Sequence, residues 1–236
     1  NEAALIAARK DKKIIEKQDF LDAVDRIIGG LEKKNKIITP KEKRTIAYHE
    51  AGHASVSWLL EHANPLVKVT IVPRGQALGA AWYLPEERQI TTKAQLLDQM
   101  ISLLGGRAAE EIVFGEVSTG ALNDLERVTK QAYAMVVYYG LDKEIGNISF
   151  YDSSGQSEYG FQKPFSDKTA EKIDAQIRSM VEEAYNKAKA ILTENREKLD
   201  ALATILVERE VIFREDVENI YGKRPWDEEK ADEQQA

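Results

Sequence analysis

Five consecutive residues, His49 to His53, carry the side chains best suited to chemistry in this chain of 236 residues. They read His-Glu-Ala-Gly-His, so the two imidazoles are four positions apart. Residues four apart on a helix lie one above the other, and both rings can therefore point at a single ion. Glu50 lies on a neighbouring part of the same surface, where its carboxylate can reach a water molecule beside the ion. The pattern indicates a zinc site with a nearby general base.

A catalytic zinc site also needs a third protein ligand and an open position for water. In one common pattern a third histidine follows six residues after the second, but Leu59 occupies that position here. We interpret His62 as a surface histidine, because it is out of register with the pair. The third ligand must then be a carboxylate further along the chain. Glu110, Glu111 and Asp124 are all candidates, and the residues alone do not choose among them.

The helix that must present the motif is predicted to begin at Thr39. Thr39 can act as the N-cap, Pro40 suits the first helical position, and Glu42 completes a capping box. No proline follows before Pro65, and several apolar residues share a helical stripe with the two histidines: Ile46, Val56 and Leu60. Gly52 is unfavourable by about 1 kcal/mol relative to alanine inside a helix. We therefore expect another element to approach this face closely.

A short sheet is predicted after this helix. Val67, Val69 and Ile71 alternate with polar residues, which indicates a half-buried strand, and residues 80–84 form a second strand. Gly79 would let another backbone approach closely. The pair is interpreted either as an edge that binds an extended peptide through its main chain or as a hairpin that only packs.

The remaining chain is predicted to be mostly helical. Helices are expected over residues 1–10, 18–29 and 168–192 and after the cap at Thr92. A further helix is expected from Asn123 to Gly140, with an apolar stripe of Val128, Ala132, Met135 and Tyr139. A helix-turn-helix is expected to follow, through Leu199, Leu202, Ile205, Phe213, Val217 and Ile220. Gly105-Gly106 either kinks its helix or permits tight packing against the metal helix. Residues 146–165 are predicted to form a long loop. The fold class expected is mainly α, a zincin-type helical domain with a small β-hairpin or sheet near the zinc helix.

Composition excludes several classes of function. A formal charge of −7 argues against nucleic-acid binding, which needs a basic face. The absence of cysteine excludes disulfides and thiolate zinc ligands. No run of about 20 apolar residues that could span a bilayer occurs, and no signal peptide is recognised. No G-x-x-x-x-G-K-[ST] segment occurs, so a nucleotide site of that type is absent.

Three segments together resemble the protease domain of the FtsH family of membrane-anchored, ATP-dependent zinc proteases: HEAGH, LLGGRAAEE and STGALNDL. The segment VTIVPRGQALG strengthens this resemblance, which covers residues 1 to about 222. It implies that His49, His53 and Asp124 bind one Zn²⁺ per chain, that Glu50 is the general base, and that Glu110 supports the metal histidines. Leu122 stands where the family commonly has a small polar residue.

The resemblance also implies a domain organisation. Residues 1–32 would be the end of the helical lid of an AAA+ ATPase, 33–38 a linker, 39–226 the zinc metalloprotease domain and 227–236 an acidic disordered tail. The family member would be a homo-hexamer that uses ATP, degrades unfolded or membrane-extracted proteins, and lies in the inner or cytoplasmic membrane with this domain on the cytoplasmic side. The membrane anchor would lie upstream, and we expect this piece to be soluble.

Two other functions are compatible with the residues. The first is a noncatalytic, ring-forming scaffold or chaperone-like domain with a structural metal site, against which the presence of Glu50 argues. The second is a helical interaction domain without metal.

Overall fold

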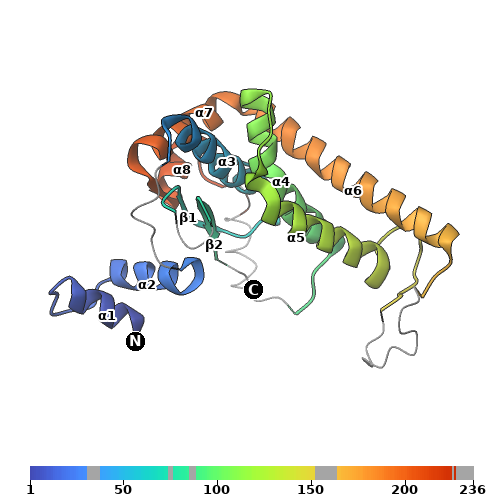
Figure 1. Ribbon diagram of the computed structural model, residues 1–236, viewed down its shortest axis with the longest axis horizontal. Helices are drawn as coiled ribbons and strands as arrows, with labels where there is room; N and C mark the ends of the chain where they lie inside the picture. Colours follow the sequence, from blue (N-terminus) through green and yellow to red (C-terminus); the bar gives the residue numbers. More distant parts are fainter. Residues whose placement is uncertain (31–37, 74–76, 85–88, 152–163, 225, 227–236) are drawn as a thin grey trace.

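The computed structural model describes residues 1–30, 38–73, 77–84, 89–151, 164–224 and 226. Helices dominate this part of the chain, together with one small three-stranded antiparallel sheet (Figure 1). The prediction of a mainly α fold is therefore confirmed. Most of the predicted linker 33–38, much of the predicted loop 146–165 and the predicted tail 227–236 lie outside the described residues.

The first two helices form a hairpin of their own beside the rest of the molecule (Figure 1). They are α1 (Glu2–Arg9) and α2 (Lys17–Gly29), and both were predicted. Their contact buries a small cluster of side chains: Ala3, Ile6 and Ala23. This cluster is separate from the main core, which lies around α3.

Helix α3 (Pro40–Leu59) is the central element and carries the His-Glu-x-x-His motif. The predicted capping box is present, since the backbone N–H of Glu42 donates to Oγ1 of Thr39 at 3.2 Å and the backbone N–H of Thr39 donates to Oε2 of Glu42 at 2.9 Å. From Ile46 to Trp58 every residue of α3 is buried. A helix buried on all sides holds its side chains in fixed positions, which suits the presentation of metal ligands.

Helix α4 (Lys93–Phe114) lies beside α3 (Figure 1). The two helices meet through facing glycines. A β-carbon on Gly52 would lie 2.4 Å from the carbonyl oxygen of Gly105, closer than any real contact. The predicted close approach at Gly52 is thus confirmed. Because α4 continues without interruption through Gly105 and Gly106, this glycine pair permits tight packing and does not break the helix.

The sheet consists of β1 (Leu66–Thr70), β2 (Ala80–Tyr83) and β3 (Val211–Phe213), in the order β2-β1-β3. Both pairs are antiparallel, and Val69 lies opposite Ala81 on one side and Ile212 on the other. Strand β3 was not predicted, because the sequence analysis read this region as a helix-turn-helix. Its three residues lie between α7 (Arg196–Arg209) and α8 (Arg214–Tyr221). So short a run gives no alternation from which a strand can be recognised.

The prediction that β1 is half-buried was wrong. Lys68 and Thr70 are only 5% and 2% exposed, although both are polar. Strand β1 is central in the sheet, so neighbours cover it on both edges, and the rest of the fold covers both faces. The Lys68 ammonium lies 5.8 Å from the centre of the Trp82 ring, a cation–π contact that helps to offset its burial.

The segment that carries Asp124 begins with a short 3₁₀ helix, Thr119–Ala121, and continues as α5 (Leu122–Tyr133). A π-helical turn, Ala134–Tyr138, follows. The wider π turn shifts the register of the helix, and Tyr139 is 59% exposed. Its predicted place on the buried stripe was therefore wrong, whereas the rest of that stripe, Val128, Ala132 and Met135, is buried.

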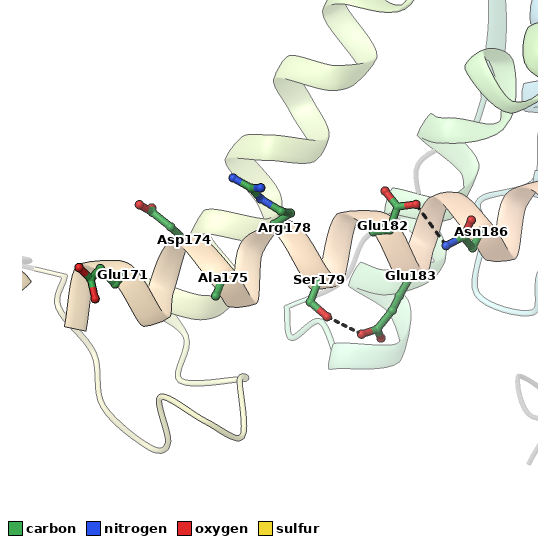
Figure 2. A pocket seen from close by; sticks show the side chains of 8 residues that line it. All are labelled: Glu171, Asp174, Ala175, Arg178, Ser179, Glu182, Glu183 and Asn186. Atoms are coloured by element: carbon green, nitrogen blue, oxygen red, sulfur yellow. Dashed lines mark hydrogen bonds between the residues drawn. The ribbon is translucent and has the colours of Figure 1, made fainter. Parts of the chain in front are cut away.

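Helix α6 (Asp167–Glu194) is the longest element and packs on α4 through one apolar stripe. Its buried residues include Ile173, Met180, Ala184 and Ala188. The opposite face is polar, and Figure 2 shows Glu171, Asp174 and Arg178 pointing away from the helix axis there. On this face Oγ of Ser179 donates to Glu183 at 2.8 Å.

The chain returns to α3 after α8 and fixes the end of the metal helix. The Trp58 indole donates to the carbonyl of Gly222 at 3.1 Å, and the Tyr221 hydroxyl donates to Oγ of Ser55 at 2.6 Å. The buried Arg224 guanidinium donates to the carbonyls of Leu60 and of two further residues just beyond α3. A cation at a helix C-terminus also interacts favourably with the helix dipole.

Candidate metal centre

Three side chains from two helices converge on one point. His49 and His53 come from α3, and Asp124 comes from the first turn of α5. Nε2 of His49 lies 3.1 Å from Nε2 of His53, and Oδ2 of Asp124 lies 3.4 Å from each of these nitrogens. Within the described residues, this is the only group of three potential ligands close enough to hold a metal ion.

The hydrogen bonds of the two imidazoles fix which nitrogen faces the centre. Nδ1 of His49 lies 2.6 Å from Oε1 of Glu110, and Nδ1 of His53 lies 2.9 Å from the carbonyl oxygen of Ser102. A carboxylate and a carbonyl can only accept, so each Nδ1 carries the proton. In the neutral rings both Nε2 atoms then present lone pairs to each other, and either a metal ion between them or a proton on one ring satisfies both.

The spacing of the three atoms fits a tetrahedral zinc ion. With Zn–N and Zn–O bonds of about 2.0–2.1 Å, neighbouring ligand atoms of a tetrahedron are about 3.3–3.4 Å apart. The 3.1 and 3.4 Å separations are close to this value. Two neutral imidazoles and one carboxylate leave a fourth position open, as catalytic zinc sites do. The residues therefore fit zinc.

Glu110 and Ser118 hold the His49 ring in place. Glu110 is 1% exposed, and its second oxygen accepts the backbone N–H of Ser118 at 2.6 Å. Oγ of Ser118 donates to the same oxygen of Glu110 that faces His49, at 3.0 Å. Three hydrogen bonds therefore hold the carboxylate against the imidazole. Support of the metal histidines by Glu110 was expected, but the part played by Ser118 was not. Ser118 is the N-cap of the 3₁₀ helix just before Asp124, and this position could have indicated that it lies near the centre.

Gly106 is a second residue whose role was missed. A β-carbon there would lie 2.5 Å from Nε2 of His49 and 2.6 Å from Nε2 of His53. The bare backbone of α4 therefore forms one wall of the centre. The pair Gly105-Gly106 was interpreted as a kink or as a packing contact with the metal helix, and nothing in the sequence distinguishes the two glycines.

Glu50 lies in the same cleft as the three potential ligands but is not grouped with them. It is 7% exposed, and a β-carbon on Gly79 would lie 2.7 Å from its Oε1. The predicted close approach at Gly79 is thus made by the Glu50 side chain and the carbonyl of Thr70. Burial raises the pKa of Glu50, while the two histidines and a hydrogen bond from the Ala81 backbone oppose the rise.

The carboxylates around the histidines alter the charge of the metal-free centre. Burial disfavours the charged His49 ring, but hydrogen bonds to Asp124 and Glu110 outweigh it and raise its pKa to about 10. Burial would raise the pKa of Asp124, but its hydrogen bonds to His49 and His53 lower it well below the usual range. In the metal-free centre His49 is thus protonated and Asp124 is ionised at neutral pH.

The other two sequence candidates lie away from this centre. The Glu111 carboxylate is hydrogen-bonded to the Tyr185 hydroxyl and to Nζ of Lys189 on α6. His62 lies beyond the end of α3, and its ring faces Glu61 at 3.9 Å. Of the three carboxylates left open by the sequence, the structure brings Asp124 to the imidazole pair.

The centre opens into a cleft of about 2010 Å³ bounded by α3, the β2 edge, α4 and α5. Strand β2 lies at the edge of the sheet, so one side of it is not paired with another described strand. Both the metal ligands and Glu50 line this cleft.

A family model decides the assignment of the chain. The model described as "Peptidase family M41" matches residues 36–220. The chain belongs to peptidase family M41. This confirms the resemblance to the FtsH family, and the chain carries a zinc metalloprotease domain whose His49–His53–Asp124 group is the candidate metal site.

Individual relatives of this M41 domain are similar over nearly all of its length. It is 65% identical over 226 residues to "ATP-dependent zinc metalloprotease FtsH" of Parabacteroides distasonis. The aligned region covers 96% of this chain and 33% of the relative. It is 55% identical over 228 residues to the protein of the same name from Rhodothermus marinus, with 96% and 33% covered. It is 47% identical over 234 residues to "Mitochondrial inner membrane m-AAA protease component AFG3L2" of Mus musculus, with 99% and 29% covered.

The M41 chain thus spans about a third of the length of these curated relatives. One relative is named as a component of an inner-membrane protease. Among the residues that the structure places, no helix has the length and apolar character needed to cross a membrane.

Proposed function

We propose that this chain is a zinc-dependent endopeptidase in which His49, His53 and Asp124 bind the ion. The observation that carries the proposal is the convergence of two Nε2 atoms and one carboxylate oxygen at the spacing that tetrahedral zinc requires. Both imidazoles are held by acceptors behind them, so their lone pairs face the centre without rearrangement.

When bound, zinc supplies Lewis-acid chemistry: it lowers the pKa of water to about 7 and polarises a carbonyl group. The chain supplies the proton transfers. Glu50 accepts the proton of the attacking water and delivers it to the leaving amine, because Glu110, the other acidic side chain beside the ligands that is not itself a ligand, is already hydrogen-bonded to His49 and Ser118. Asp124 and Glu110 balance the charge of the ion and hold His49.

The position of Glu50 favours catalysis over a structural metal site. A structural zinc ion has a closed set of four protein ligands and needs no base. Here three potential ligands are present among the described residues, and the buried Glu50 lines the same cleft. A noncatalytic scaffold would gain nothing from a buried carboxylate at this place, which is costly to desolvate.

We also propose how the domain works in the longer protein. Residues 1–32 would be the end of an ATPase lid and 39–226 the protease domain; the linker 33–38 and the acidic tail 227–236 complete the division. The separate core of the α1–α2 hairpin supports this division. The names of the relatives support ATP-dependent proteolysis and a location at the inner membrane. We propose in addition, from the resemblance to the FtsH family, that the longer protein degrades unfolded or membrane-extracted proteins as a homo-hexamer at the inner or cytoplasmic membrane, with this domain on the cytoplasmic side.

The test is proteolysis of casein by the chain loaded with zinc. The wild type should be active and should lose activity in a zinc chelator. Glu50→Gln should retain zinc, and its rate of proteolysis should fall by a factor of about 10²–10⁴. His49→Ala should lose the ion. Activity should not depend on ATP, since this chain has no phosphate-binding loop. Full activity of Glu50→Gln, or activity that resists zinc removal, would contradict the proposal.

A further inference from the structure

Arg127 is a cation of the cleft that has no ion-pair partner among the described residues. Arg127 lies on α5 one turn after Asp124 and lines the cleft with it. No ion pair or hydrogen bond joins its guanidinium to another residue in the described part of the chain. The carboxylate of the neighbouring Glu126 forms an ion pair with Nζ of Lys130 at 2.5 Å.

The surroundings of Arg127 place it on the His53 side of the centre. Ser57, one turn beyond His53 on α3, lies 2.9 Å from the hydroxyl of Tyr83 at the end of β2. Burial raises the pKa of the Tyr83 hydroxyl, and the positive charge of Arg127 opposes this rise. The two side chains are therefore close enough to interact electrostatically. Arg127 therefore faces the cleft near Tyr83.

The same side of the cleft offers further hydrogen-bonding groups. Ser102 and Gln99 line it from α4, and Gln131 lines it one turn beyond Arg127. Oγ of Ser102 is buried and has no partner among the described residues. Gln131 is held by the carbonyl of Leu96 at 2.6 Å, so this wall is fixed.

At the other end of the cleft, Arg44 already makes cation–π contacts with two aromatic rings. The Arg44 guanidinium lies 5.5 Å from the centre of the Tyr48 ring and 5.6 Å from that of Phe114. Of the two arginines described in the cleft, Arg44 is thus stacked on aromatic rings, and Arg127, on the His53 side, is the one without a partner among the described residues. A guanidinium binds carboxylates through two parallel hydrogen bonds and is the side chain best suited to them.

We propose that Arg127 binds a carboxylate of the peptide substrate, either an acidic side chain or the C-terminal carboxylate, on the His53 side of the cleft. This inference rests on the proposed peptidase function and adds a substrate preference to it. Arg127 is a specificity residue, since it lies beyond the metal ligands and takes no part in the proton transfers.

The test uses fluorogenic peptides that differ only in Glu or Gln at one position on either side of the scissile bond, each with a free or amidated C-terminus. For the wild type, kcat/KM should favour either one Glu position or the free C-terminus by about two- to fivefold, the upper part of the range of an ion pair that solvent reaches. The two sets of peptides distinguish the side chain from the C-terminus. High salt should reduce the preference.

The variants separate recognition from general damage. Arg127→Gln should bring the Glu-to-Gln ratio of kcat/KM close to one, and Arg127→Glu should favour a Lys peptide at the same position. Arg178→Gln is the matched control, an exposed arginine on the outer face of α6 (Figure 2) whose loss should leave the ratio unchanged. A uniform fall for all peptides in Arg127→Gln, or no preference in the wild type, would overturn the inference.

Binding of the same peptides, measured by fluorescence anisotropy in the Glu50→Gln protein with zinc, is independent of turnover. If no peptide is cleaved but binding shows the preference and its loss in Arg127→Gln, the peptidase proposal fails and carboxylate recognition stands. If binding shows no preference either, the inference fails as well.

Discussion

The backbone of Gly106 lies directly against the imidazole of His49: a β-carbon on this glycine would be 2.5 Å from Nε2. It would be almost equally close to Nε2 of His53, so any side chain here enters the space between the two rings. A helix of the core thus forms one wall of the metal centre with its main chain alone.

Gly106→Ala should therefore lose zinc while the protein stays folded. The added methyl group displaces the ligand nitrogens, whereas alanine itself stabilises a helix by about 1 kcal/mol relative to glycine. Zinc content and the circular dichroism spectrum together check this. Retention of one zinc per chain would show that the wall is not as close as described.

Gly52→Ala should act on stability instead. Its methyl group would meet the backbone of Gly105 at 2.4 Å, and neither helix can yield without disturbing the buried contact. Overpacking of this kind costs about 1–3 kcal/mol, which exceeds or offsets the gain in helix propensity. Urea denaturation of the metal-free protein should show a lower free energy of unfolding. An unchanged value would contradict the tight contact between α3 and α4.

Glu110→Gln should weaken zinc binding without abolishing the site. The amide can still meet Nδ1 of His49 but no longer presents a charged acceptor, and the loss of such a partner weakens metal binding by about 10–100-fold. Glu111→Gln is the matched control, because that side chain faces Tyr185 and Lys189 on α6. Competition with a chromogenic chelator measures both. Equal effects of the two substitutions would remove the role of Glu110.

Zinc binding should release protons near neutral pH. In the metal-free protein the pKa of His49 is raised to about 10, so its ring is protonated at pH 7 and must lose that proton to bind the ion. Asp124 has a lowered pKa and is already ionised. Titration calorimetry in buffers of different ionisation enthalpy should report release of about one proton. Zinc affinity should rise roughly tenfold per pH unit from about pH 7 up to the pKa of His49. Affinity independent of pH would contradict the shifted pKa.

The centre of the fold and its chemistry could be predicted from short-range patterns. The cap at Thr39, the His49–His53 spacing and the unusual Gly52 all express local helix geometry or a local cost, and the sequence contains them directly. The choice of Asp124 over Glu111 could not be made from the residues, because it depends on how α5 crosses α3 and on the partners that α6 offers Glu111.

The errors have the same physical origin. Lys68 is buried because β3, about 140 residues later, pairs with its strand, and no local pattern reports such a partner. Tyr139 leaves the buried stripe because a π turn widens the helix, which an ideal period does not anticipate. Ser118 and Gly106 act on the centre through contacts between elements, so their residue types alone did not reveal them.

The most direct test is anomalous X-ray diffraction at the zinc edge from crystals of the wild-type chain. We expect one peak within about 2.0–2.2 Å of Nε2 of His49, Nε2 of His53 and an oxygen of Asp124, with the fourth position not taken by a protein atom. A peak that excludes Asp124, or a fourth protein ligand that closes the site, would contradict the account.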